Sequence, residues 1–280
     1  MLLSPFEYRA ARSVDEAVAL FAGKPGGRYL AGGTDLLPQL RGKRRAELLI
    51  DIKRIDELRA IRVREDRGLA IGAAVPLADI AAHDVVGAHY PLLRECCNAV
   101  GAYPLRNRAT MAGNICNASP AADTAVALLA LDAVVVARGP GGTREIPVAG
   151  FFTGPGQTVL APGELVIAIV LPAASAGVRG SYERLSRRRG MDLATVGVLV
   201  GRGPGSQAPR HRVALAAVAP VPLRVAAAEE LLDRDPAGGL HDAAEAARAA
   251  ARPITDLRGS AEYRRDMVGV LVERAVKHLS

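Results

Sequence analysis

Two adjacent glycines, Gly32 and Gly33, stand where a short predicted strand, residues 28–31, gives way to a helical stretch from Thr34 to about Leu40. At such a junction the unpaired N–H groups and the positive end of the helix dipole can hold a phosphate. Glycine also permits positive φ and close approach of another group to the backbone. The junction lacks the spacing of a P-loop or a G-x-G-x-x-G fingerprint, and taken alone it is more often a plain tight turn.

A second polar segment follows about 75 residues later. Thr110, Gly113 and Asn114 fall close together in a predicted irregular loop, which leads into a helix predicted over residues 121–131 with Ser119 as its N-cap. Buried amides need hydrogen-bond partners, so this density of polar residues indicates a polar ligand or extensive backbone contacts. A turn and an N-cap would explain Ser119 but not the three residues before it.

Hydrophobic periodicity divides the rest of the chain into short elements. A capping box at Ser13–Glu16 begins a helix predicted over 14–22, and a helix is predicted over 91–100. Strands are predicted at 47–52, 58–64, 69–75, 133–138, 143–148 and 164–171. We place a domain boundary in the small-residue segment 173–180. Beyond it the pattern predicts three strands (181–188, 193–201, 212–219) and three helices (224–233, 239–251, 258–278).

Composition excludes several classes of protein. The net charge of +7 comes from 36 basic residues of which only four are lysine, and aromatic residues make up 4% with no tryptophan, so nucleic-acid binding has little support. Basic runs at Arg41–Arg45 and Arg187–Arg189 are expected on a solvated surface or against an acidic partner. Three cysteines and scattered histidines predict no metal site, no iron–sulfur centre and no catalytic nucleophile. Without a secretory leader or a membrane-length apolar run, we expect a cytoplasmic chain.

The motifs Ala31-Gly-Gly-Thr-Asp35, Thr110-Met-Ala-Gly-Asn114 and Asn117-Ala-Ser-Pro-Ala-Ala-Asp123 together resemble the FAD-binding medium subunit of molybdenum hydroxylases. This family includes carbon monoxide dehydrogenase and bacterial xanthine dehydrogenase. The resemblance implies an α+β fold: a two-subdomain FAD-binding domain of the PCMH type over 1–175, divided at about residue 55, and a small α+β C-terminal domain over 176–280.

The resemblance also implies which residues bind FAD. Those that would wrap the diphosphate are Arg28, Tyr29, Leu30, Ala31, Gly32, Gly33, Thr34 and Asp35. Those that would complete the opposite wall, hold the sugar-alcohol chain or lie near the isoalloxazine ring are Thr110, Gly113, Asn114, Asp123, Leu160, Tyr182 and Arg184. Arg184 stands where relatives usually carry lysine. Met111-Ala112 departs from the commoner Ile-Gly, which matters if that position needs positive φ.

By the same resemblance the flavin performs the redox chemistry, and the chain supplies no catalytic residue and no metal ligand. A large subunit with the molybdenum cofactor would oxidise the substrate, and a small subunit with [2Fe-2S] clusters would relay electrons to FAD, in a dimer of heterotrimers. A carbon monoxide dehydrogenase-like complex is the nominal assignment. A xanthine, purine or other N-heterocycle dehydrogenase subunit and a cofactor-free scaffold with the same fold are the alternatives. The chain itself would not contact the substrate.

Overall fold

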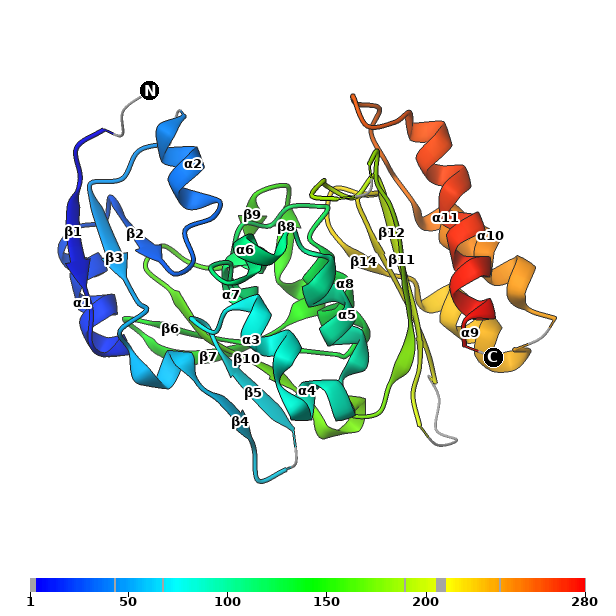
Figure 1. Ribbon diagram of the computed structural model, residues 1–280, viewed down its shortest axis with the longest axis horizontal. Helices are drawn as coiled ribbons and strands as arrows, with labels where there is room; N and C mark the ends of the chain where they lie inside the picture. Colours follow the sequence, from blue (N-terminus) through cyan, green and yellow to red (C-terminus); the bar gives the residue numbers. More distant parts are fainter. Residues whose placement is uncertain are drawn as a thin grey trace.

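The computed structural model describes residues 4–42, 44–66, 68–188, 190–204, 210–236 and 238–279. Three main sheets follow one another along the long axis, with helices between and outside them (Figure 1). Helices and strands are thus mixed along the whole chain, and the predicted α+β class is confirmed.

The first sheet is parallel and has the order β1-β3-β2, with strands Glu7–Ala10, Leu48–Asp51 and Gly27–Leu30. Helix α1 (Val14–Gly23) starts as predicted: the Ser13 hydroxyl accepts from the Glu16 N–H. Helix α2 (Leu36–Arg41) follows the double glycine. Strand β1 was not predicted, because its largely exposed residues show no apolar alternation.

The second sheet is antiparallel, in the order β4-β5-β10-β6-β7. Its strands are Ile61–Val63, Leu69–Gly72, Leu165–Leu171, Val134–Gly139 and Gly142–Pro147, and the two predicted hairpins are confirmed. Helices α3 (Leu77–Ala82), α4 (Asp84–His89), α5 (Pro91–Ala99) and α8 (Asp123–Ala130) pack beside it, as does the small pair β8 (Phe152–Gly154) and β9 (Gln157–Thr158). Short 3-10 helices span Asp56–Arg59, Val148–Gly150 and Ala173–Ser175.

The third sheet, β11-β12-β13-β14, is buried on both faces in its centre. Its strands are Arg179–Leu185, Val196–Arg202, His211–Ala216 and Leu223–Arg224. One face carries α9 (Ala226–Arg234), α10 (Leu240–Ala250) and α11 (Ala261–Lys277), as predicted, and the other packs on α5 and α8 (Figure 1). This explains why β12 is a continuous apolar run rather than an alternating one. The two-residue β14 adds a fourth strand to the three predicted.

The segment around Thr110 differs from prediction. In place of an irregular loop it forms two short helices, α6 (Tyr103–Arg106) and α7 (Met111–Cys116), and the Thr110 hydroxyl caps α7 by accepting from the Gly113 N–H at 3.0 Å. Helix α8 begins at Asp123, so Ser119 is not its N-cap; the Ser119 hydroxyl accepts from Ala121 N–H in a turn that precedes the helix. Ala112 is helical and therefore accommodates its Cβ without strain.

Within the described ranges, no helix has both the length and the hydropathy needed to cross a bilayer.

Candidate cofactor-binding cleft

A cleft of about 650 Å³ lies between the first and second sheets and extends to the connection between β11 and β12. That volume is typical of a cofactor site. The first wall comes from one continuous stretch, residues 28–35, followed by Leu36, Gln39 and Arg44. The facing wall contains Thr110, Gly113, Asn114, Asp123 and Leu160. Thirteen of the fifteen residues predicted from the sequence therefore line one cleft, and the other two, Tyr182 and Arg184, contact it through Asp123.

The two glycine-containing segments press directly against each other. A Cβ on Gly32 would lie 2.0 Å from the carbonyl oxygen of Arg108, just before the Thr110 cap. Gln39 on α2 donates from Nε2 to Asn117 Oδ1 at 2.9 Å, which joins the same two walls at a second point. Only one of the two glycines is needed for its backbone angle: Gly33 has φ +72°, whereas Gly32 is needed for the close approach.

Asn114 is oriented by a neighbour on α8. Its Oδ1 accepts from the Thr124 hydroxyl at 2.6 Å, and Thr124 is completely buried. Because the carbonyl side of the amide is occupied in this way, its NH₂ group remains as a donor in the cleft wall.

On the first wall, Tyr29 stacks on Phe21 and donates from its hydroxyl to the Gly163 carbonyl at 2.8 Å. Burial raises the pKa of Asp35.

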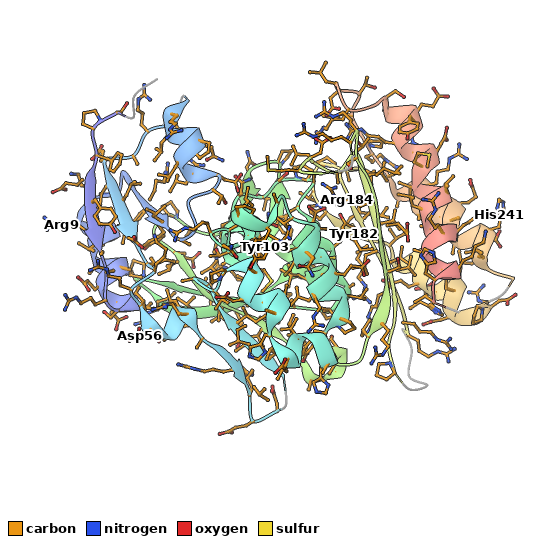
Figure 2. All side chains as sticks on the ribbon, in the orientation of Figure 1. Arg9, Asp56, Tyr103, Tyr182, Arg184 and His241 are labelled. Atoms are coloured by element: carbon orange, nitrogen blue, oxygen red, sulfur yellow. The ribbon has the colours of Figure 1, made fainter. Side chains whose placement is uncertain are left out.

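Asp123 connects the cleft to the third sheet. Its Oδ1 accepts from the Tyr182 hydroxyl at 2.7 Å and from Arg184 Nε at 3.0 Å, and both donors come from β11 (Figure 2). Burial raises the pKa of the Asp123 carboxyl, and the Arg184 charge and the Tyr182 hydrogen bond oppose that rise. Burial, together with the Asp123 charge, also raises the Tyr182 pKa well above its usual value. Tyr182 and Arg184 thus hold Asp123 in position rather than line the cleft themselves.

The cleft wall carries two arginine side chains, Arg28 and Arg44, and Arg44 donates to Gln39 Oε1. Arg28 Nε is buried and has no hydrogen-bond partner in the described part of the chain. Arg44 lies close enough for the Arg28 charge to lower its pKa, although burial contributes more to that shift. Two neighbouring guanidinium groups at a glycine-rich strand–helix junction suit a diphosphate.

Sequence reasoning missed Gln39, Arg44 and the cleft-lining residues Arg188, Met191 and Leu193. The basic runs that contain Arg44 and Arg188 were visible, but a run of arginines alone does not distinguish a solvated surface from a cleft wall. Among the residues that the structure describes, no group of three or more histidine, cysteine or acidic side chains is arranged to hold a metal ion.

Comparison with known proteins decides the family. Residues 4–174 match the family described as the FAD binding domain in molybdopterin dehydrogenase, and residues 181–279 match the CO dehydrogenase flavoprotein C-terminal domain. The chain belongs to the FAD subunits of the molybdopterin dehydrogenases. The resemblance read from the motifs is thereby confirmed, and the cofactor of this family is FAD.

Individual FAD subunits are similar along almost their whole length. The carbon monoxide dehydrogenase medium chain of Hydrogenophaga pseudoflava is 39% identical over 282 residues, covering 99% of this chain and 97% of that one. The xanthine dehydrogenase FAD-binding subunit of Escherichia coli O157:H7 is 31% identical, covering 96% and 94%. In structure, a carbon monoxide dehydrogenase from Hydrogenophaga pseudoflava matches with a TM-score of 0.93 over 99% of this chain and 98% of that one.

The contact at Gly32 gives a first prediction for this FAD subunit. In Gly32→Ala the new Cβ would force residues 108–109 away, because the atoms it meets are backbone and cannot rotate aside. We expect a loss of about 1–3 kcal/mol of stability, typical of overpacking, and weaker FAD binding. Gly150→Ala is the control, since nothing lies within 4 Å of its added Cβ. Thermal melting and flavin titration measure both effects; equal behaviour of the two variants would contradict the close contact.

The Asp123 network gives a second prediction. Asp123→Ala leaves the Arg184 guanidinium, whose side chain is 15% exposed, without its carboxylate, and should cost about 3 kcal/mol in the free energy of unfolding. Arg184→Lys retains a positive charge beside Asp123 and should cost clearly less. Denaturant unfolding of both variants tests this order, and a larger loss in Arg184→Lys than in Asp123→Ala would show that Asp123 does not organise the network.

Proposed function

We propose that the chain binds FAD in the cleft and acts as the electron outlet of a molybdenum hydroxylase complex. The observation that carries this proposal is the cleft wall formed by residues 28–35. It contains the Arg28 Nε, which has no hydrogen-bond partner among the described residues, and it contacts the backbone just before Thr110. Bound FAD would take up two electrons with two protons and release them to an external acceptor. The chain's own task is to bind, orient and shield that group.

Individual side chains have distinct parts in this arrangement. We assign the diphosphate to the backbone around Gly32 and Gly33 and to Arg28 and Arg44. The Asn114 amide and the Asp123 carboxylate suit hydroxyl groups of the ribityl chain, because one donates and the other accepts. Leu160, between β9 and β10, lines the cleft, and we assign its backbone to the polar edge of the ring. Tyr182 and Arg184 position Asp123.

The partners follow from the family. Relatives are medium chains of dehydrogenases, which supports a large and a small partner subunit for this chain. We assign the molybdenum cofactor to the large subunit and the [2Fe-2S] clusters to the small one, in a dimer of heterotrimers in the cytoplasm. Within this chain, residues 1–175 would form the FAD-binding domain, with subdomains that meet near residue 55, and residues 176–280 the C-terminal domain.

Oxidation of carbon monoxide is our nominal assignment for the complex. It is supported by the 39% identity to the carbon monoxide dehydrogenase medium chain of Hydrogenophaga pseudoflava, against 31% to the xanthine dehydrogenase subunit. The assembled complex under anaerobic carbon monoxide should lose its oxidised-flavin absorbance, and xanthine should leave that absorbance unchanged. Bleaching by xanthine alone would instead favour a purine dehydrogenase.

Binding of FAD through the arginine pair can be tested on this chain alone. Arg44→Gln should weaken binding of FAD and of ADP about tenfold or more, because a hydrogen bond to a charged group is worth about 1.5–3 kcal/mol. Riboflavin, which has no diphosphate, should bind the variant and the wild type equally. Isothermal titration gives all three affinities.

The neighbouring Arg45→Gln is the matched control, since Arg45 is exposed like Arg44 but lies outside the cleft wall. It removes the same charge from the same run and should change the affinities for FAD and ADP by less than twofold. Equal losses in both variants would assign the effect to overall charge, and a wild-type chain that takes up no FAD would overturn the proposed function.

A further inference from the structure

A tight turn between α10 and α11 projects an apolar side chain into solvent. Asp256 and Gly259 exchange two backbone hydrogen bonds of 3.2 Å, so Leu257 and Arg258 form the tip of the turn. Leu257 is 97% exposed, and Ile254 just before the turn is exposed as well. One exposed leucine is ordinary on a protein surface. The ion pairs that hold the turn under Leu257 set this leucine apart.

Ion pairs of the Asp256 carboxylate hold the turn at its base. The Asp256 carboxylate accepts from the Arg258 backbone N–H at 2.8 Å and from the Arg258 guanidinium at 2.7 Å. It also binds Arg264, whose side chain is only 2% exposed and which donates from Nη1 to the Ala217 carbonyl at 3.0 Å. A buried arginine therefore anchors the base of a turn whose tip is an exposed leucine. Such pre-organisation lowers the entropic cost of binding a partner.

The turn adjoins the mouth of the cleft. A Cβ on Gly259 would lie 3.4 Å from Thr195 Cγ2, which places the turn beside the end of the connection between β11 and β12. The same connection carries Met191 and Leu193, both exposed and both in the cleft wall. Figure 1 shows the two connections at the same end of the third sheet. We call Met191, Leu193, Ile254 and Leu257 the cleft-mouth surface.

We propose that the cleft-mouth surface is the docking site for the polypeptide that carries the [2Fe-2S] clusters, an inference that rests on the proposed function. Electron transfer slows steeply with distance, so the immediate donor must cover the mouth of the cleft, whereas the molybdenum subunit need not. Arg187 and Arg188 lie near the carboxylates of Asp192 and Asp256, and Asp256 also pairs with Arg258 and Arg264, so that arginines outnumber carboxylates among these side chains. The partner should therefore offer an apolar socket for Leu257 with acidic residues beside it.

The test uses the FAD-loaded chain and the purified [2Fe-2S] polypeptide. Leu257→Asp should weaken their association at least tenfold, because a central apolar anchor dominates binding and a carboxylate opposes the acidic rim expected on the partner. Val63→Asp is the control, because Val63 is also an exposed aliphatic side chain but lies on β4, in another sheet. It should leave the association within twofold of wild type. Both variants should keep the wild-type melting temperature and FAD affinity.

A second variant tests the rigid presentation. Asp256→Ala leaves Leu257 in place but releases the turn, and it should weaken association less than Leu257→Asp while FAD affinity is kept. Wild-type affinity of Leu257→Asp for the [2Fe-2S] polypeptide would overturn the docking site. So would a variant that keeps this affinity but no longer associates with a second copy of the chain, because the surface would then bind another copy of this chain. If the wild-type chain binds FAD but does not bind the [2Fe-2S] polypeptide, its proposed role in the complex is wrong. The docking site, which rests on that role, is then wrong as well.

Discussion

The contact of Gly32 with the Arg108 carbonyl is the constraint on which the cleft depends. It brings the unit built on the parallel first sheet against the turn between α6 and α7, with no side chain between the two backbones. Because the contact involves backbone on both sides, it fixes the separation of the two walls more firmly than a side-chain contact would. The hydrogen bond from Gln39 to Asn117 then sets the same walls at a second point, so their mutual orientation is defined as well as their distance.

The same logic extends to the third sheet through Asp123. Its carboxylate lies in the cleft wall, yet both of its hydrogen-bond donors come from β11, so the C-terminal part of the chain takes part in shaping a site that it does not itself line at those positions. An isolated carboxylate at this depth would be unfavourable, since burial alone raises its pKa. Arg184 and Tyr182 offset that cost and at the same time restrict where the carboxylate can point.

Much of this was predictable from the sequence, and the failures have physical causes. Periodicity identified most of the longer elements, and the two distant motifs were expected to meet. The short helix after Thr110 was missed because glycine and asparagine at its centre are poor helix formers, whereas its stability comes from a cap and from burial on α8. The role of Arg44 depends on which side of a loop faces inward. The link between Asp123 and Arg184 joins residues 61 positions apart, and no local pattern encodes it.

The range of substrates named for the matched relatives is also informative. The matched relatives carry names for different substrates, carbon monoxide and xanthine, yet each aligns with this chain over more than nine-tenths of both lengths. A chain that contacted those substrates would need different binding residues for each, because a small gas and a purine share no polar groups. A chain that contacts only the cofactor and its partner polypeptides needs no such change. Similarity along the whole length therefore agrees with the proposed separation of substrate chemistry from electron delivery, in which the subunit that binds the substrate identifies it directly.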